Sequence, residues 1–413
     1  MSTFTPALRR PRVLIATRIF APEGAAAALR LAALARALAD EGCEVVVLTS
    51  VPPRCLREQA DEFDELAAET TAAGGSIHVY RRPVLRDTTG AVRGYLPYLS
   101  FDLPLLVRLL TASKADVVVN EPPPTTGLMT RLACAIRRTP YVYYAADILS
   151  DAARAQGTPP CVVDAVRWME SASMRGASRV IAVSEGVAER VRALSGRGAD
   201  VVLNGVDASA PINEDGAGAT PRGFPATRGP VFLYAGTVAD WLAPEVFISA
   251  FERVRSDLAG ARLVFLGQGG AWRSLKRRAR GVRDIIFHDP VSAEEARYWY
   301  ASATASLASI RHGAYDYAYP TKILSSLACG TPVIYAGRGA AREDVLDAHL
   351  GWAVDVDADQ IAAAMRSAAA CPAEDPRRDR ARLRRWVDEH RSARASSAEA
   401  ARIVFDAMRC PRL

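Results

Sequence analysis

The segment 317–333, YAYPTKILSSLACGTPV, contains a lysine at a position where it could bind phosphate. Pro320 favours a helix start, because the N–H that proline lacks would be unpaired in the first turn anyway. Apolar residues then recur at helical spacing until Cys329-Gly330, where glycine can take the left-handed conformation of a helix end. Lys322, one of only three lysines in the chain, would lie in the first helical turn and favour a bound anion. A solvated lysine is the alternative, and spacing alone leaves both interpretations open.

Polar residues and glycines follow the predicted strands of the C-terminal half. These short apolar runs are 231–235, 262–266, 284–287 and 304–309. Gly236-Thr237 follows the first strand and Gly267-Gln268-Gly269 the second, and glycine lets backbone N–H groups approach a phosphate closely. Arg311 and His312 follow the fourth strand, where they could add positive charge or lie on the surface.

The N-terminal half has the same pattern of strands and polar ends. Its predicted strands are 12–17, 44–49, 76–80, 116–119 and 141–144. The first strand, the next loop and an alanine-rich helix ending near Gly42 form the opening of a doubly wound sheet. The loop contains Gly24 but no G-x-G-x-x-G, which disfavours a dinucleotide. Glu121 and Asp147 follow strands and should face the ligand crevice; a helix cap or turn is the alternative role for Asp147.

Length and composition favour two domains. A chain of 413 residues exceeds one ordinary core, so two domains of roughly 200 residues are expected. The strand–helix pattern stops after residue 207, and residues 208–229 are rich in Ala, Gly, Pro and Thr, as linkers are. We therefore predict an α/β fold with an N-terminal domain over 1–207, a C-terminal domain over 230–384 and a terminal helix within 385–413.

The stretch PTKILSSLACGTPVI resembles the donor-site signature of retaining GT-B glycosyltransferases of the GT4 type. The matching residues are Pro320, Lys322, Ala328, Gly330, Pro332, Val333 and Ile334. The family's two glutamates, which hold the donor sugar and the ribose, are replaced by Tyr317 and Ser325. Two further segments resemble the family, namely Phe20, Pro22, Gly24 and Arg30 for its F-x-P-x-G-G start and Asn204–Asp207 for its N-G-V-D segment.

The resemblance implies a GT-B fold, with two facing Rossmann-like domains and a C-terminal helix that crosses back to the first. The second domain would bind the nucleotide sugar, with the base near 287–291, and the first domain the acceptor. The implied catalytic residues are Lys322, Asp147 and Glu343. The implied donor-binding residues are Gly236, Thr237, Gly267, Gly269, His288, Val291, Arg311, Tyr317, Pro320, Thr321 and Ser325. The implied acceptor side is Gly24, Arg30 and Glu121.

The same resemblance implies the type of reaction. A sugar would move from a UDP-type donor to a hydroxyl acceptor with retention of configuration. No cofactor beyond the donor is expected, and the lack of a suitably placed D-x-D motif indicates a metal-independent enzyme. Lys322 and the helix start would then balance the charge of the leaving diphosphate.

Charge and cysteine content restrict the partners and the compartment. The net charge of +6 suits phosphorylated donors or an anionic membrane surface, whereas no basic stripe with interleaved aromatics suggests nucleic acid. The seven cysteines show no C-x-x-C spacing, which argues against zinc and disulfides and favours the cytoplasm. The N-terminus lacks the apolar core of a signal peptide, and no run of about 18 apolar residues predicts a membrane-spanning helix.

The segment Tyr95–Leu110 is strongly apolar, and basic residues precede it. It could be a helix that contacts the inner face of the membrane. The competing interpretation is a core helix, which Pro97 and Pro104 favour by breaking the run.

Three classes of function remain open. The first is a glycosyltransferase, whose acceptor is either a small molecule or a polyprenyl-linked lipid. The second is a non-catalytic GT-B protein that binds a nucleotide sugar or a partner, which Tyr317 and Ser325 suggest. The third is a GT-B sugar-nucleotide epimerase, although the acidic and histidine residues of that activity are not visible.

Overall fold

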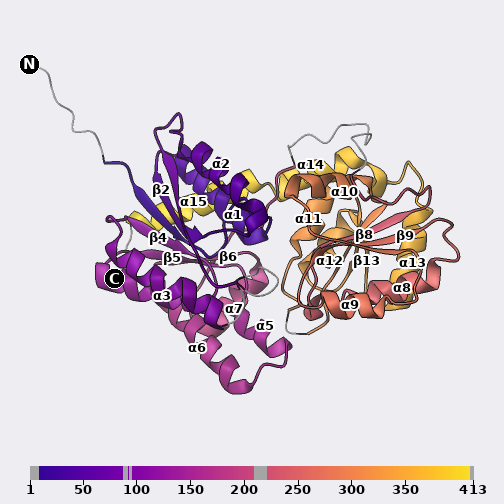
Figure 1. Cartoon of the computed structure of the whole chain (residues 1–413), viewed down its shortest axis with the longest axis horizontal. Helices are drawn as coiled ribbons and strands as arrows, with labels where there is room; N and C mark the ends of the chain where they lie inside the picture. The colour runs from indigo at the N-terminus through magenta and orange to yellow at the C-terminus, as the bar shows by residue number, and fades with distance from the viewer. Residues whose placement is uncertain (1–8, 87–91, 93–94, 209–220, 314, 410–413) are drawn as a thin grey trace, which may run out of the picture. The chain divides into compact units, whose positions relative to one another are not determined.

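The computed structural model describes residues 9–86, 92, 95–208, 221–313 and 315–409. They form two compact α/β units (Figure 1). Unit 1 comprises Met1–Ser150, Pro159–Leu203 and Arg394–Leu413, and unit 2 comprises Asp151–Thr158 and Asn204–Ala393. Of the predicted linker, 209–220 lies outside the described residues.

Unit 1 is built on a seven-stranded sheet with the order β3-β2-β1-β4-β5-β6-β7. Its strands are β1 (Arg12–Ala16), β2 (Glu44–Ser50), β3 (Ser76–Arg82), β4 (Val117–Asn120), β5 (Tyr141–Ala145), β6 (Arg179–Ala182) and β7 (Asp200–Val201). All of the pairings are parallel, and β4 and β5 are buried along their whole length, which explains their continuous apolar sequences. The strand order reverses between β1 and β4, and doubly wound sheets bind ligands at such a switch point.

The helices of unit 1 connect these strands and include the last helix of the chain. They are α1 (Ala26–Asp40), α2 (Arg57–Ala68), α3 (Tyr95–Thr111), α4 (Pro124–Arg137), α5 (Leu149–Ala155), α6 (Pro160–Gly176), α7 (Glu185–Ser195) and α15 (Ala393–Arg409). The unit boundary cuts α5 after Ser150. Helix α15 buries Ile403 and Val404, so a segment from the far end of the sequence completes the core of unit 1.

Helix α3 corrects the expectation that two prolines break the run Tyr95–Leu110. Pro97 lies in the first turn, where no intrahelical N–H donor is needed. Pro104 lies inside the helix and removes one hydrogen bond. The helix continues past it because Leu105 and Leu109 are buried and packing outweighs the lost bond.

Unit 2 is built on a six-stranded sheet with the order β10-β9-β8-β11-β12-β13. Its strands are β8 (Val231–Thr237), β9 (Arg262–Gln268), β10 (Ile285–His288), β11 (Ala305–Ser309), β12 (Val333–Ala336) and β13 (Gly351–Val354). These pairings are also parallel, and the order reverses between β8 and β11. The predicted fold class, an α/β protein with two Rossmann-like parallel sheets, is therefore confirmed.

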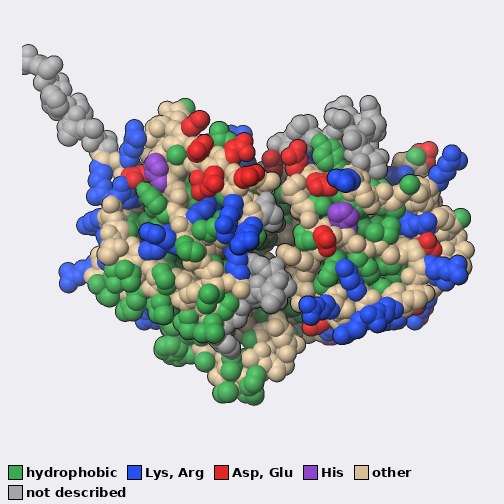
Figure 2. Space-filling model, viewed as in Figure 1, with side chains coloured by type: hydrophobic (Ala, Val, Ile, Leu, Met, Phe, Trp, Pro, Cys, Tyr) green, Lys and Arg blue, Asp and Glu red, His purple; other side chains and the backbone are tan. Residues whose placement is uncertain are grey.

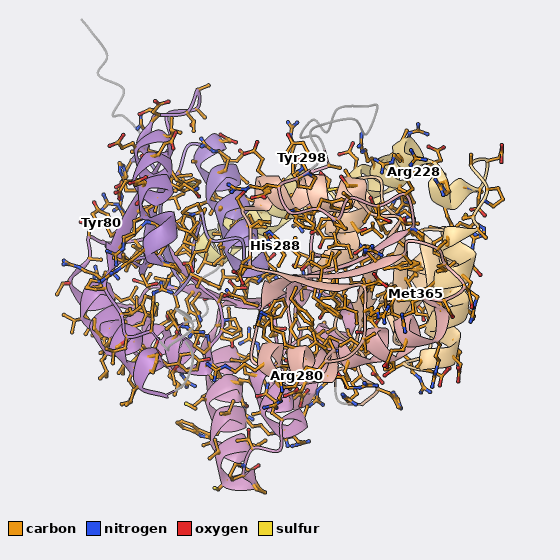
Figure 3. The ribbon with its side chains drawn as sticks, turned by 45° about the vertical axis from the view of Figure 1, so that its right-hand side comes forward. Tyr80, Arg228, Arg280, His288, Tyr298 and Met365 are labelled. Carbon is orange, nitrogen blue, oxygen red and sulfur yellow. The ribbon has the colours of Figure 1, made fainter. Side chains whose placement is uncertain are left out.

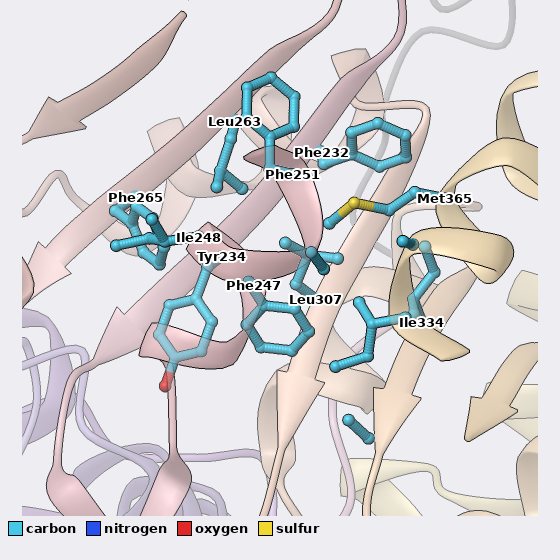
Figure 4. Close-up of a cluster of buried hydrophobic side chains, with 14 of the residues drawn as sticks. Phe232, Tyr234, Phe247, Ile248, Phe251, Leu263, Phe265, Leu307, Ile334 and Met365 are labelled. Atoms are coloured by element: carbon cyan, nitrogen blue, oxygen red, sulfur yellow. The ribbon is translucent and has the colours of Figure 1, made fainter. Parts of the chain in front are cut away.

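Helices cover both faces of the second sheet. They are α8 (Glu245–Val254), α9 (Trp272–Arg278), α10 (Ala293–Ser302), α11 (Thr321–Ala328), α12 (Ala340–Asp347), α13 (Ala358–Ala369) and α14 (Arg380–His390). On one face, α8, α9 and α13 pack on a cluster that includes Phe232, Tyr234 and Phe265 (Figure 4). On the other face, α10, α11, α12 and α14 pack on two further clusters. No described helix is both long and apolar enough to cross a bilayer.

Candidate active site

Lys322 lies beside the C-terminal end of β8 in unit 2. It is the second residue of α11, and Pro320 is the N-cap that precedes the helix rather than its first residue. The ammonium Nζ lies 3.5 Å from the centre of the Tyr234 ring, a cation–π contact. This Nζ is buried and has no hydrogen-bond partner among the described residues. Its loss of hydration lowers the pKa of Lys322 to about 7.

A buried ammonium without an acceptor is costly unless something completes its hydrogen bonds. The Tyr234 hydroxyl donates to the carbonyl of Thr237 at 3.1 Å and does not accept a hydrogen bond from Nζ. An incoming anion such as a diphosphate would supply the missing acceptors. The burial of Nζ therefore rules out the alternative of a fully solvated surface lysine.

The glycines at the ends of β8 and β9 have two different roles. Gly267 and Gly269 have φ values of +143° and +152°, and a Cβ on either would overlap the carbonyl oxygen of Gly236 or Val238. They are needed for the close approach of the two strands. Gly236 and Thr237 are exposed, and a Cβ on Gly236 would lie 4.0 Å from Cε of Lys322. Of these three glycines, Gly236 borders the open space beside the lysine.

Tyr317 and Ser325, which stand where the family signature has glutamates, both have partners inside unit 2. The hydroxyl of Tyr317 donates to the Asp151 carboxylate at 3.0 Å, and its ring stacks on Tyr315. The hydroxyl of Ser325 donates to the carbonyl of Thr321 at 3.2 Å, one helical turn earlier. The structure thus brings a carboxylate to position 317 through Asp151, a contact that the sequence does not reveal.

Three ionisable residues near the same sheet edge have different surroundings. Arg311 follows β11 and pairs with Glu245 at 2.5 Å, which offsets part of its charge. His312 pairs with Asp316 at 2.6 Å. Glu343 lies in the first turn of α12 and is exposed. Thus Lys322 is the buried cation of this edge, while Arg311 and His312 are exposed and already paired.

The end of β10 is the predicted site of the nucleotide base. His288, labelled in Figure 3, is its last residue. The His288 ring packs against Trp299 at 4.9 Å, and its Nδ1 lies 2.8 Å from the carbonyl oxygen of Asp289. Val291 packs on the same cluster as Trp299. The side chains of His288 and Val291 are therefore engaged with the protein, whereas Asp289 and Pro290 are exposed.

In unit 1, Arg30 and Glu121 form a buried ion pair. It joins α1 to the end of β4 at the switch point, and the Arg30 guanidinium also lies over the ring of Tyr144. The second carboxylate oxygen of Glu121 and both polar atoms of the Asn120 side chain are buried without a hydrogen-bond partner among the described residues. These atoms are unsatisfied groups that a polar ligand could complete.

Asp147 and Gly24 lie at the same edge of unit 1. Although the Asp147 side chain reaches solvent, desolvation raises its pKa to about 6, and the charge of Arg30 opposes that rise. Gly24 has no positive φ, and a Cβ added to it would meet nothing within 4 Å. The fold therefore does not require glycine at position 24.

A cavity in unit 1 was not predicted from the sequence. Its volume is about 260 Å³, and it lies just beyond the ends of β2 and β3. Its lining contains no acidic side chain and consists of Val51, Pro52, Pro53, Arg54, Arg57, Pro83, Val84 and Arg86. The arginines are spread over two segments of the sequence, and only the pairing of β2 with β3 brings them together.

Comparisons with known proteins agree with these observations. Residues 25–207 match the family model of the glycosyl transferase 4-like domain, and residues 229–370 match that of glycosyl transferases group 1. A D-inositol 3-phosphate glycosyltransferase from Xylanimonas cellulosilytica is 32% identical over 133 residues. The aligned segment covers 30% of this chain and 30% of that relative.

Solved structures share the architecture over almost the whole chain. HepE from Anabaena, in complex with UDP and glucose, has a TM-score of 0.68 at 15% identity and covers 95% of this chain and 99% of its own. Sucrose-phosphate synthase from Thermosynechococcus elongatus has a TM-score of 0.72 at 15% identity and covers 96% and 99%. At this identity they show the fold alone, and the two family models, which together account for most of the chain, add the family. The chain therefore combines a domain of the glycosyl transferase 4-like family with a following domain of the glycosyl transferases group 1 family.

Proposed function

We propose that the protein transfers a glycosyl group from a nucleotide sugar, most simply a UDP-sugar, to a hydroxyl group, with retention of configuration. The observation that carries this proposal is Lys322, a buried ammonium without a hydrogen-bond acceptor, at the switch point of unit 2. UDP and glucose accompany the similar HepE structure, which supports a uridine diphosphate donor.

In this proposal unit 2 binds the donor. The bond between the anomeric carbon and the diphosphate breaks, and a bond from that carbon to the acceptor oxygen forms. Lys322 and the N-terminus of α11 stabilise the negative charge that develops on the diphosphate. Because the protein supplies this charge itself, we expect transfer without a divalent metal and with full activity in the presence of a chelator.

Unit 1 would bind the acceptor. In this proposal Asp147 would accept a hydrogen bond from the reacting hydroxyl, and the unsatisfied atoms of Asn120 and Glu121 would bind further hydroxyl groups. The arginine-lined cavity favours an acceptor that carries phosphate, because guanidinium groups bind phosphate oxygens in pairs. The name of the inositol-phosphate relative is consistent with such an acceptor. The cytoplasm is the compartment that this proposal favours. Cys43, Cys134, Cys161, Cys329 and Cys371 are free thiols.

The test is product formation from a panel of nucleotide sugars with phosphorylated and unphosphorylated acceptors. Lys322→Ala should lower turnover on the order of 100-fold, as the loss of a single oxyanion donor does in other enzymes. Lys322→Arg should restore only part of the activity, because a planar fork does not replace a compact ammonium.

Ser325→Ala is the matched control, since it removes only a hydroxyl bonded to its own helix. It should retain most of the turnover. A non-catalytic protein that binds nucleotide sugars is the second candidate, which the partners of Tyr317 and Ser325 favour. That candidate would take first place if no donor of the panel were turned over, or if Lys322→Ala kept normal turnover with every accepted donor.

A further inference from the structure

Helix α3 is apolar on two opposite faces. One face is buried through Phe101, Leu105 and Leu109. The opposite face is exposed, and its apolar side chains follow one another at intervals of three or four residues, namely Leu96, Leu99, Leu103, Val107 and Leu110. A helix on the surface of a soluble protein normally places polar side chains on its outer face. The burial of the inner face therefore accounts for only three of the nine Leu, Val and Phe residues in α3.

The neighbouring helix α4 extends this exposed surface. It packs beside α3 and exposes Leu132 and Ile136, which are one helical turn apart. We define the apolar face as Leu96, Leu99, Leu103, Val107, Leu110, Leu132 and Ile136, with exposed fractions between 36% and 71%. Figure 2 shows hydrophobic side chains gathered over α3. Contiguous patches of this kind mark interaction surfaces.

The charges around the apolar face are positive. The only acidic residue in α3 and α4 is Asp102, which is buried and accepts a hydrogen bond from Thr126 at 2.6 Å. Arg137 of α4 donates to the carbonyl of Leu109 at 2.7 Å, so its guanidinium lies at the C-terminal end of α3. Lys114 and Arg138, just beyond the two helices, are exposed. The margin of the apolar face is thus basic, without an exposed carboxylate on either helix.

We propose that the apolar face docks on a membrane that contains anionic lipids, with the outer leucines in the acyl boundary and the basic residues among the phosphates. Apolar burial and attraction of basic residues to anionic lipids are the two contributions that hold interfacial helices on bilayers. A protein partner or a second copy would need acidic groups to match this basic margin, and neither helix supplies them from this chain. The proposal does not depend on the transferase activity, because α3 and α4 contain neither Lys322 nor Asp147.

The experiment is co-sedimentation of the full-length protein with vesicles. One set contains phosphatidylglycerol and phosphatidylcholine, and the other contains phosphatidylcholine alone. We expect binding to the anionic vesicles, and weaker binding at high salt because the electrostatic part is screened. The double variant Leu103→Glu/Val107→Glu should lower the partition coefficient about ten-fold or more. Arg138→Glu should lower it about five-fold or more, because each basic residue near the surface contributes about that factor.

Leu66→Glu is the matched control, because Leu66 on α2 is 56% exposed, the same as Leu103, and lies outside the apolar face. It should bind vesicles like the wild type. All variants should keep their far-ultraviolet circular dichroism and their donor turnover. The proposal is overturned if the wild type stays in the supernatant with anionic vesicles, or if the double variant binds as well as the control. It is equally overturned if size-exclusion chromatography shows that the only effect of the double substitution is to convert a dimer into a monomer.

Discussion

At the residue scale, each unit contains one group whose pKa is shifted toward neutrality, downward in unit 2 and upward in unit 1. Desolvation lowers the pKa of Lys322 to about 7 and raises that of Asp147 to about 6. The ammonium is charged below its pKa and the carboxylate is ionised above its own. Both charged forms therefore coexist only in a narrow range between these two values.

We expect this range to set the pH dependence of kcat/KM. The value should be highest between about pH 6 and pH 7 and should fall on both sides. Lys322→Ala should remove the alkaline limb and Asp147→Asn the acidic limb. A profile that keeps both limbs in both variants would show that other groups control the reaction.

Arg30 and Glu121 allow a prediction about stability. Their side chains are only 13% and 4% exposed, so Arg30→Ala leaves a buried carboxylate without its counter-charge. The free energy of unfolding should fall by about 3–5 kcal/mol. Arg36→Ala, an exposed arginine on the same helix, should change it by less than about 0.5 kcal/mol. Urea denaturation of both variants measures the difference. If both variants lose the same free energy of unfolding, the buried ion pair contributes no more to stability than an exposed arginine does.

At the element scale, the close approach of β8 and β9 depends on glycine. Gly267→Ala places a Cβ against the Gly236 carbonyl at a φ of +143°. We expect a loss of roughly 1–3 kcal/mol of stability from backbone strain, together with weaker donor binding. Gly270→Ala is the control, because its Cβ meets nothing within 4 Å. Thermal unfolding and titration with a UDP-sugar separate the two effects; similar behaviour of the two variants would contradict this account.

The sequence predicted most elements and part of the site. Parallel strands were evident because buried strands are continuous apolar runs, and Lys322 was evident because a proline and a glycine mark the ends of its helix. Tyr234 was missed, since nothing in an apolar run shows which aromatic ring lies under a lysine. The contact of Tyr317 with Asp151 and the arginine cavity depend on side chains far apart in the chain. The continuity of α3 depends on packing that outweighs the effect of Pro104.

At the scale of the whole molecule, the chain does not complete its units in sequence order. Unit 1 begins with β1 but also requires α15, whose Ala400, Ile403, Val404 and Ala407 are buried. Unit 2 lies between these two parts of the sequence. Truncation after Ala393 should therefore destabilise unit 1, although most of that unit is far from the truncation point in the sequence.

This expectation can be measured by hydrogen exchange on a variant that ends at Ala393. Amides of β1–β6 should exchange faster, because the loss of α15 exposes apolar surface of unit 1, while amides of β8–β13 should keep their protection. A full-length variant with Arg402→Ala, an exposed residue of α15, should behave like the wild type. Faster exchange confined to unit 2 would contradict the assignment of α15 to unit 1.

The position of α15 also has a consequence for synthesis on the ribosome. The strands of unit 1 emerge first, yet the helix that completes its core emerges after all of unit 2. This chain therefore cannot follow the usual order, in which an N-terminal domain folds while the next is being made. Unit 2 can reach its final form while the nascent unit 1 still exposes the surface that α15 will cover. The part of the nascent chain that was made first is then the part that most needs a chaperone.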